Sequence, residues 1–229
     1  MARSSPRSAR RFAQAGFSFI EILVVMGIIS VLVSMVVVVV PFIREKGKRT
    51  KSIDNVRTMI LYFTGSGAGL ETHWPKYNGK DFVLWLVATK KIDKADDKQL
   101  GILFSPGDEY LTFDAPCVKE AFKEFGPTSI GSSNQNNLKL TSYAGRRNNT
   151  KEHLLSSAEQ QKNGIIICDD DDGALHHKDG LVCGYVGGAA RFVDWNDLGV
   201  PEPSDPNDPK GILGDTSPSD ELKHMSSQN

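Results

Sequence analysis

The sequence predicts an α+β fold in which a long N-terminal helix packs against a small antiparallel β-sheet. Residues 17–40 form an apolar run of 24 residues in which Glu21 is the single charged residue. Near the other end of the chain, residues 164–168, 180–186 and 190–195 are short segments rich in Ile and Val, bounded by Gly and Asp. A long helix followed by a strand meander is typical of an α+β domain.

The apolar run is long enough to cross a membrane. A helix of 24 residues rises roughly 36 Å, and the hydrocarbon core of a bilayer is about 30 Å thick. Residues 1–16 precede it as a short leader that contains four Arg and no acid. We therefore expect a leader over residues 1–16 and a membrane-spanning helix that begins near Phe17.

The helix is expected to continue past Pro41 to Thr64. Pro41 removes one helix hydrogen bond, which favours a kink at that point. Apolar residues then recur at helical spacing from Ile43 to Phe63, which predicts a stripe that packs on a globular head. The glycine-rich residues 65–69 end the helix, so the spine helix is assigned to residues 17–64.

The head is assigned to residues 65–198 and the tail to residues 199–229. The sheet of the head is expected to be an antiparallel meander, with a hairpin turn at Gly187-Gly188 between its last two strands. The polar residues 128–163 predict a long surface excursion. The tail contains five prolines, many acids and no aromatic residue, a composition typical of disorder.

Composition and charge exclude several classes of protein. The chain has 27 Lys and Arg against 28 Asp and Glu, so its net charge of −1 gives no electrostatic argument for nucleic acid binding. Three cysteines are too few for a zinc ribbon or a disulfide-dense scaffold. Gly-x-Ser-x-Gly and His-Glu-x-x-His motifs are absent from the sequence, so we expect no enzymatic activity.

The junction at Gly16-Phe17, with Glu21 as the fifth residue of the segment after it, resembles the prepilin signal of type IV pilins and type II secretion pseudopilins. Ala15 stands where that family usually has Lys or Arg. The resemblance implies that a prepilin peptidase cleaves after Gly16 and methylates the new amine of Phe17. It also implies that Glu21 pairs with the Phe17 amine of a neighbouring subunit, which would compensate the cost of a carboxylate in a membrane.

The resemblance further implies where the protein lies and what it contacts. The helix would cross the bacterial inner membrane once, with the head in the periplasm or on an extracellular filament. The expected partners are the prepilin peptidase, membrane lipid, the inner-membrane assembly machinery, and copies of the chain itself and of other pilins or pseudopilins. No cofactor is implied.

A second resemblance concerns the C-terminal part of the head. Some prepilin-like proteins carry a His, nine further residues, and then Asp-Gly before a final strand. His177 and Gly187-Gly188 have that spacing, with Gly187 at the usual Asp position. The physical content of the match is a hairpin whose turn requires a positive φ.

Two groups of residues in the head are candidate sites. Asp169, Asp170 and Asp172, with Asp179 as an extra ligand, could bind Ca²⁺ through carboxylate oxygens; a solvated acidic turn is the alternative. Cys168 and Cys183 fall on neighbouring predicted strands, where they could form a disulfide outside the cytoplasm or remain buried free thiols.

Three functions are compatible with these features. The first is a structural subunit of a type IV pilus-like filament or a type II secretion pseudopilus, assembled through its N-terminal helix. The second is a minor pilin or adhesin-type binding module that uses residues 128–163. The third is a periplasmic enzyme anchored to the membrane by the helix. We expect the first, because a filament subunit needs only a spine and a compatible head.

Overall fold

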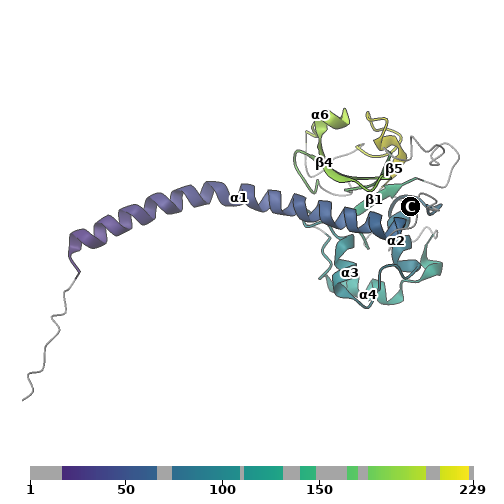
Figure 1. Ribbon diagram of the computed structural model, residues 1–229, viewed down its shortest axis with the longest axis horizontal. Helices are drawn as coiled ribbons and strands as arrows, with labels where there is room; N and C mark the ends of the chain where they lie inside the picture. The colour runs from purple at the N-terminus through teal and green to yellow at the C-terminus, as the bar shows by residue number, and fades with distance from the viewer. Residues whose placement is uncertain are drawn as a thin grey trace, which may run out of the picture. The chain divides into compact units, whose positions relative to one another are not determined.

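The structure is a computed structural model that describes residues 17–65, 74–108, 111–130, 140–147, 164–169, 175–204 and 212–226. The chain divides into two compact units, residues 1–43 and residues 44–229. Helix α1, Phe19–Thr64, begins in the first unit and ends in the second (Figure 1). Each unit is described below by itself.

The first unit consists of the apolar part of α1. Its large apolar side chains are exposed, from Phe17 at 83% to Val39 at 49%. Helix α1 is long and apolar enough to cross a membrane, and no protein atoms cover its most apolar window. Pro41 lies inside α1, and the helix continues through it.

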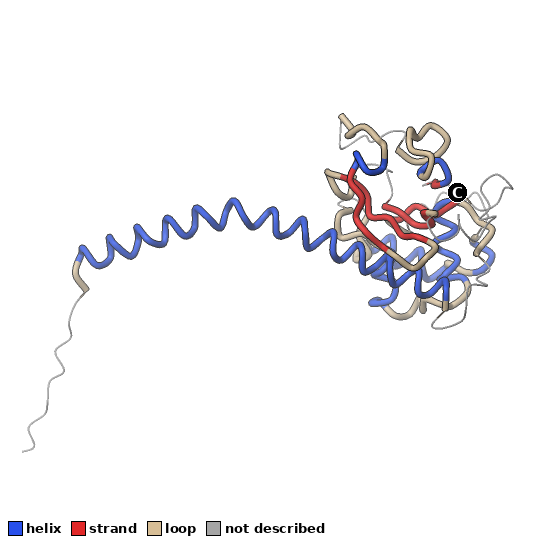
Figure 2. The backbone as a smooth tube through the Cα atoms, turned by 45° about the horizontal axis from the view of Figure 1, so that its top comes forward, coloured by secondary structure: helices blue, strands red, loops and turns tan. Residues whose placement is uncertain are grey.

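The second unit is built on a five-stranded antiparallel sheet, shown in red in Figure 2. The strand order is β4-β3-β2-β1-β5. The strands, in chain order, are β1 Tyr143–Arg146, β2 Ile165–Asp169, β3 Gly180–Tyr185, β4 Ala190–Asp194 and β5 Met225–Ser226. The helix and antiparallel sheet confirm the α+β fold predicted from the sequence.

The predicted hairpin at Gly187-Gly188 joins β3 to β4. Leu181 pairs with Val193 and Val182 with Phe192, so the two strands are in antiparallel register. Gly188 has a φ of +89° and donates its N–H to the carbonyl of Tyr185. This positive φ explains why glycine is needed in the turn.

Side chains of β3 alternate between the two faces of the sheet, as expected for a pleated strand. Val182 and Val186 enter one hydrophobic cluster, while Leu181, Cys183 and Tyr185 enter the other. The first cluster also contains the buried residues of α1, α2 (Gly79–Ala88) and α4 (Pro116–Glu124). The short helices α3 (Asp97–Leu100), η1 (Gly101–Leu103) and η2 (Pro127–Ser129) complete that side.

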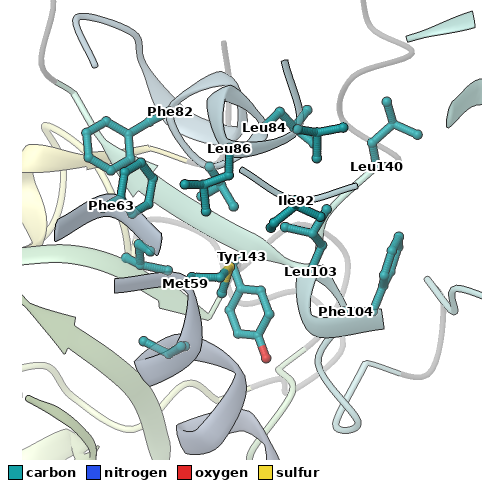
Figure 3. Packing of buried hydrophobic residues seen from close by; sticks show 14 of the residues in the cluster. Met59, Phe63, Phe82, Leu84, Leu86, Ile92, Leu103, Phe104, Leu140 and Tyr143 are labelled. Atoms are coloured by element: carbon teal, nitrogen blue, oxygen red, sulfur yellow. The ribbon is translucent and has the colours of Figure 1, made fainter. Parts of the chain in front are cut away.

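Figure 3 shows the first cluster, where Met59 and Phe63 of α1 lie among side chains of α2 and β1. The Phe63 and Phe82 rings are 5.1 Å apart between centroids. Lys91 donates to the carbonyls of Tyr62 and Phe63 at the end of α1. The C-terminal part of α1 is therefore a core element of the second unit.

The second cluster corrects the predicted disordered tail, because described residues beyond 199 are buried in it. Ile212, Leu213, Leu222 and Met225 are buried with Trp195 and Leu198 of α6, which spans Trp195–Leu198. The helical turn η4, Leu222–His224, leads into β5, which pairs with β1. The tail is rich in prolines and acids, but the few apolar residues among them cover a sheet face that would otherwise be exposed.

We predict that Gly184→Ala destabilises the second unit. A Cβ at Gly184 would lie 2.4 Å from Val56 Cγ1 and 2.8 Å from Ile60 Cδ1 of α1. Overpacking of this kind costs about 1–3 kcal/mol of unfolding free energy. Urea denaturation of the fragment 44–229 measures it, with Gly126→Ala as the matched control because an added Cβ there meets no atom within 4 Å. Equal stability of the Gly184→Ala and wild-type fragments would contradict the packing.

Candidate functional site

The start of α1 carries the first candidate site. Ser18 donates its backbone N–H to Oε2 of Glu21 at 3.2 Å, and the Glu21 N–H donates to the Ser18 carbonyl. Glu21 therefore sits in the first turn of the helix, where an acid suits the exposed backbone N–H groups. Phe17 precedes the helix and is exposed. Gly16 lies outside the described residues.

The two serines within the apolar part of α1 satisfy their own hydroxyls. Ser30 Oγ donates to the Met26 carbonyl at 2.8 Å, and Ser34 Oγ donates to the Val31 carbonyl at 2.7 Å. Neither hydroxyl therefore needs water or a second protein, and the serines leave this stretch compatible with an apolar environment.

The second candidate site is a buried polar network between α1 and the sheet. His177, just before β3, places Nδ1 2.9 Å from Oε1 of Glu45. Its Nε2 lies 3.3 Å from Oγ of Ser52 and 3.8 Å from Oδ2 of Asp169. The His177 ring is fully buried. One imidazole thus contacts three polar side chains on two elements.

His176 lies between two buried carboxylates. Its Nδ1 is 3.4 Å from Oδ1 of Asp169, and its Nε2 is 3.4 Å from Oδ2 of Asp108. Burial alone would lower the pKa of His176, but the hydrogen bonds and charges of Asp108 and Asp169 outweigh burial and raise this pKa to about 10. His176 is accordingly a protonated imidazolium paired on both sides.

Asp169 is the centre of this network, and strand geometry places it there. Cys168 belongs to the second cluster, so the next residue of β2 points to the opposite face, where α1 packs. The Asp169 side chain is 0% exposed, and its Oδ2 accepts the backbone N–H of Val182 at 2.7 Å. Each carboxylate oxygen of Asp169 is therefore contacted by a group of the protein.

The hydroxyl groups form a chain with one consistent direction. Gly107 donates its N–H to Ser105 Oγ at 3.2 Å, and Ser105 Oγ lies 2.9 Å from Ser52 Oγ. If Ser105 donates to Ser52, then Ser52 can donate to Nε2 of His177, and Nδ1–H of His177 donates to Glu45. Every group in the chain is then satisfied, as buried polar groups require.

Further contacts, nearer the surface of the head, hold the turn of residues 176–179 against α1. Arg49 forms ion pairs with Asp179 and, at 3.4 Å, with Glu45. Its guanidinium also lies 4.2 Å from the ring centroid of Phe192 on β4. Trp195 donates Nε1–H to the carbonyl of Lys178 at 2.9 Å. Residues 176–179 are thus fixed on both sides.

The network has the atom order of a nucleophile, base and carboxylate, and it is buried between α1 and the sheet. Ser52, His177 and Glu45 lie in the sequence of contacts that a hydrolytic triad would use. Ser52 is 0% exposed. Two cavities of the described head, of about 380 and 440 Å³, are lined by other residues, and both include Lys94.

The structure does not test the calcium prediction, which named Asp169, Asp170, Asp172 and Asp179. The Asp169 carboxylate pairs with the His176 ring and accepts the backbone N–H of Val182. The Asp179 carboxylate forms an ion pair with Arg49. Asp170 and Asp172 lie outside the described residues. Among the residues that the structure describes, His, Cys, Asp and Glu form no group of three or more arranged to hold a metal ion. Calcium binding by Asp169, Asp170, Asp172 and Asp179 stays a prediction.

Cys168 and Cys183 are directly paired across β2 and β3, as their predicted strands required. Both are buried, and both are free thiols in the structure. Burial, and then the charge of Asp169, raise the pKa of the Cys183 thiol. A disulfide between them stays a prediction, with the register as its support.

Sequence reasoning missed most of the network. Three polar residues, Glu45, Ser52 and Asn55, lie on the face of α1 that packs against the head. Asn55 donates to the Phe104 carbonyl at 3.0 Å and to the Tyr143 hydroxyl at 3.4 Å. Glu45, Ser52 and Asn55 recur at helical spacing within the apolar stripe of α1, and this pattern could have indicated a buried polar network. Asp108 and Ser105 come from a loop distant in sequence, and local patterns do not connect them to His176 or Ser52.

Fold and site define a class: a protein with one exposed apolar helix, long enough to span a membrane, continuing into the core of an α+β head. Residues 11–37 match the family model described as the prokaryotic N-terminal methylation motif. This match supports the type IV pilin-like prepilin family, and it covers the end of the leader and the first part of α1 without the head. Neither a curated protein nor a solved structure matches the chain.

We predict that the stability of the head falls as the pH rises from about 6.5 to 10. The folded-state pKa of His176 is raised above its ordinary value, so its contribution is complete below pH 6.5 and is lost as pH rises through about 10. The slope is at most about 1.4 kcal/mol per pH unit. Urea denaturation of the fragment 44–229 between pH 5 and 10 measures it.

Two variants separate His176 from other titrating groups. His176→Gln should remove the decline, because no imidazolium remains to lose a proton. Asp108→Asn should move the decline to lower pH, since one of the carboxylates that raise the pKa of His176 is gone. The same slope in both variants and in the wild type would contradict the assignment.

Proposed function

We propose that this protein is a structural subunit of a type IV pilus-like filament or type II secretion pseudopilus. In this proposal a prepilin peptidase removes residues 1–16 and methylates Phe17. The apolar part of α1 first anchors the chain in the inner membrane and then packs with other subunits as the filament spine. The head lies in the periplasm or on the filament surface.

The observation that carries the proposal is the methylation motif at residues 11–37, located on a helix whose apolar surface is uncovered. An exposed apolar surface of this extent requires lipid or other protein around it. The Ser30 and Ser34 hydroxyls bond to carbonyls of their own helix, while one oxygen of Glu21 accepts the Ser18 N–H and its charge is left for the amine of a neighbouring subunit. The same helix could therefore be transferred from lipid to a helical bundle.

The buried network supports a mechanical role for the head. A filament subunit must transmit force between its spine and its surface without separating them. His177, Arg49 and Asp169 fix residues 44–64 of α1 to the sheet through contacts on both sides of the turn. Polar contacts of this kind specify one orientation of the helix against the sheet, which apolar packing alone specifies less strictly.

A catalytic role has less support, because the one triad-like arrangement is buried. The alternative of a binding module that uses residues 128–163 also lacks a specific observation. Most of that range lies outside the described residues, and its described strand β1 is in the core, with Tyr143 and Ala144 fully buried. We therefore propose assembly, with no reaction, as the activity of the protein.

We predict that Glu21→Ala is inserted and cleaved normally but fails to assemble. Removing the carboxylate lowers the cost of insertion and deletes the partner for a neighbour's Phe17 amine. Mass spectrometry of the membrane-extracted protein should find a methylated Phe17 at the N-terminus in both wild type and variant. Sheared filaments should be lost, at least tenfold, in the variant alone; Ser18→Ala, which keeps the carboxylate and the Ser18 N–H, is the matched control.

Two results would contradict the proposal. An N-terminus other than Phe17 in the wild-type protein would exclude prepilin processing. Normal filament yield from Glu21→Ala would exclude the pairing role of the carboxylate, while leaving the processing intact.

A further inference from the structure

Two cysteines lie opposite each other on neighbouring strands of the sheet. Cys168 of β2 and Cys183 of β3 are register partners, and both are fully buried in the second hydrophobic cluster. Side chains alternate between the two faces along a strand, and directly paired residues point to the same face. The two sulfur atoms therefore lie on one side of the sheet, among the same apolar residues.

The hydrogen bonds of β3 show which kind of antiparallel pair the cysteines form. Tyr185 donates its N–H to the carbonyl of Ala189, on the side of β4. Residues two apart along a strand direct their backbone groups to the same side, so Cys183 also faces β4. Val182 instead donates toward β2, to Oδ2 of Asp169. Across β2 and β3 the cysteines are therefore a non-hydrogen-bonded pair.

A non-hydrogen-bonded pair has the spacing that a disulfide needs. Its Cα atoms lie about 4.5 Å apart, against roughly 5.5 Å in a hydrogen-bonded pair, and its side chains are closer. The Cα atoms of disulfides usually lie about 4.4–6.8 Å apart. The register thus places Cys168 and Cys183 within bonding reach without a shift of either strand. Cys117, the third cysteine, lies on α4 and is exposed.

We propose that Cys168 and Cys183 form a disulfide that joins β2 to β3 in the mature protein. This inference rests on the proposed function in one respect, because the head must lie outside the reducing cytoplasm for the bond to persist. The disulfide closes across the strands and leaves Cys117 as a thiol.

The oxidant is a protein disulfide of the dithiol oxidoreductase class. One cysteine thiolate attacks that disulfide and forms a mixed disulfide, and the second thiolate then displaces the oxidoreductase as a dithiol. One S–S bond is broken in the oxidoreductase and one is formed in the head. The two cysteines lose two electrons and two protons, which the oxidoreductase gains as thiols.

The folded head protects these thiols from oxidants. Both are 0% exposed, and burial raises the pKa of the Cys183 thiol, so little thiolate is present to react. Tail residues Ile212 and Leu222 belong to the cluster that covers the pair. We therefore expect oxidation during folding, before the tail covers this face of the sheet. The finished head then shields the disulfide from reductants in the same way.

The disulfide closes a loop that contains most of the buried polar network. Residues 169–182 lie between the two cysteines and include Asp169, His176 and His177. A cross-link around these 14 residues restricts the unfolded chain, which stabilises the folded state. Asp169 and Val182 directly adjoin the cysteines, so the bond also fixes the carboxylate to the N–H that it accepts. The disulfide thus stabilises the turn that holds α1.

The test is a count of reactive thiols in the full-length protein, extracted from membranes and unfolded in urea with an alkylating reagent. Without a reductant only Cys117 should react, and peptide mapping should find Cys168 linked to Cys183. After reduction all three cysteines should react. Cys117→Ser is the matched control, with no reactive thiol expected before reduction and two after it.

A stability measurement tests the consequence of the bond. A reductant should lower the urea midpoint of the detergent-solubilised protein by about 1 M, because the closed loop is lost from the unfolded chain. Cys117→Ser should show the same shift. Cys168→Ala with Cys183→Ala should not respond to the reductant, since it has no bond to lose. A wild-type midpoint that does not respond would overturn the stabilising role.

Two results of the thiol count would overturn the inference. They are three reactive thiols before reduction, and a disulfide that includes Cys117. Failure of the proposed function is distinguishable in the same mass spectra, because it appears as an N-terminus other than Phe17. Three reactive thiols on a chain that begins at Phe17 would reject the disulfide and leave the filament proposal intact.

Discussion

The head depends on one buried carboxylate, Asp169. It has no access to water, and an uncompensated charge in that position would be strongly destabilising. The protein compensates it with the imidazolium of His176 and the N–H of Val182. These partners belong to β3 and the turn before it, so the carboxylate fixes the turn, and the turn fixes α1 through Glu45 and Arg49.

This arrangement supports the proposed role of the head as part of a filament spine. Apolar packing of Val56, Met59, Ile60 and Phe63 buries the C-terminal part of α1 in the head. Such packing is non-directional, whereas the hydrogen bonds of Ser52, Asn55 and Glu45 hold only in one rotation and one register of the helix. A small movement of α1 would leave several buried polar groups unpaired, each at a cost of about 1–3 kcal/mol.

The features predicted from the sequence were those encoded locally. The apolar run, the acid at Glu21 and the Gly16-Phe17 pair lie within a few residues of one another, and β3 and β4 alternate as two-sided strands do. Gly187-Gly188 contains its own turn preference. For these elements, neighbouring residues carry the structural information, and the α+β class follows from their order.

The remaining features depend on contacts between distant segments. In the sequence, Asp169 is the first residue of an acidic run that predicts an exposed turn. The pleat of β2 and the packing of α1 instead direct its side chain into the head. His176 meets Asp108 across a loop whose length does not predict its path. The composition of the tail favours disorder because Ile212, Leu213, Leu222 and Met225 are sparse, yet the face of the sheet that they cover supplies the partner that their local sequence lacks.

The most direct test of this account is hydrogen exchange along α1 in the full-length protein in detergent micelles. If the network joins the helix to the sheet, amides from Ser52 to Ile60 should exchange as slowly as those of β3, through unfolding of the whole head. In Glu45→Gln with His177→Gln, protection of the helix amides should fall while that of β3 is retained. Exchange of the helix amides in the wild type at a rate faster than and independent of β3 would contradict the central claim, because the helix would then open without the head.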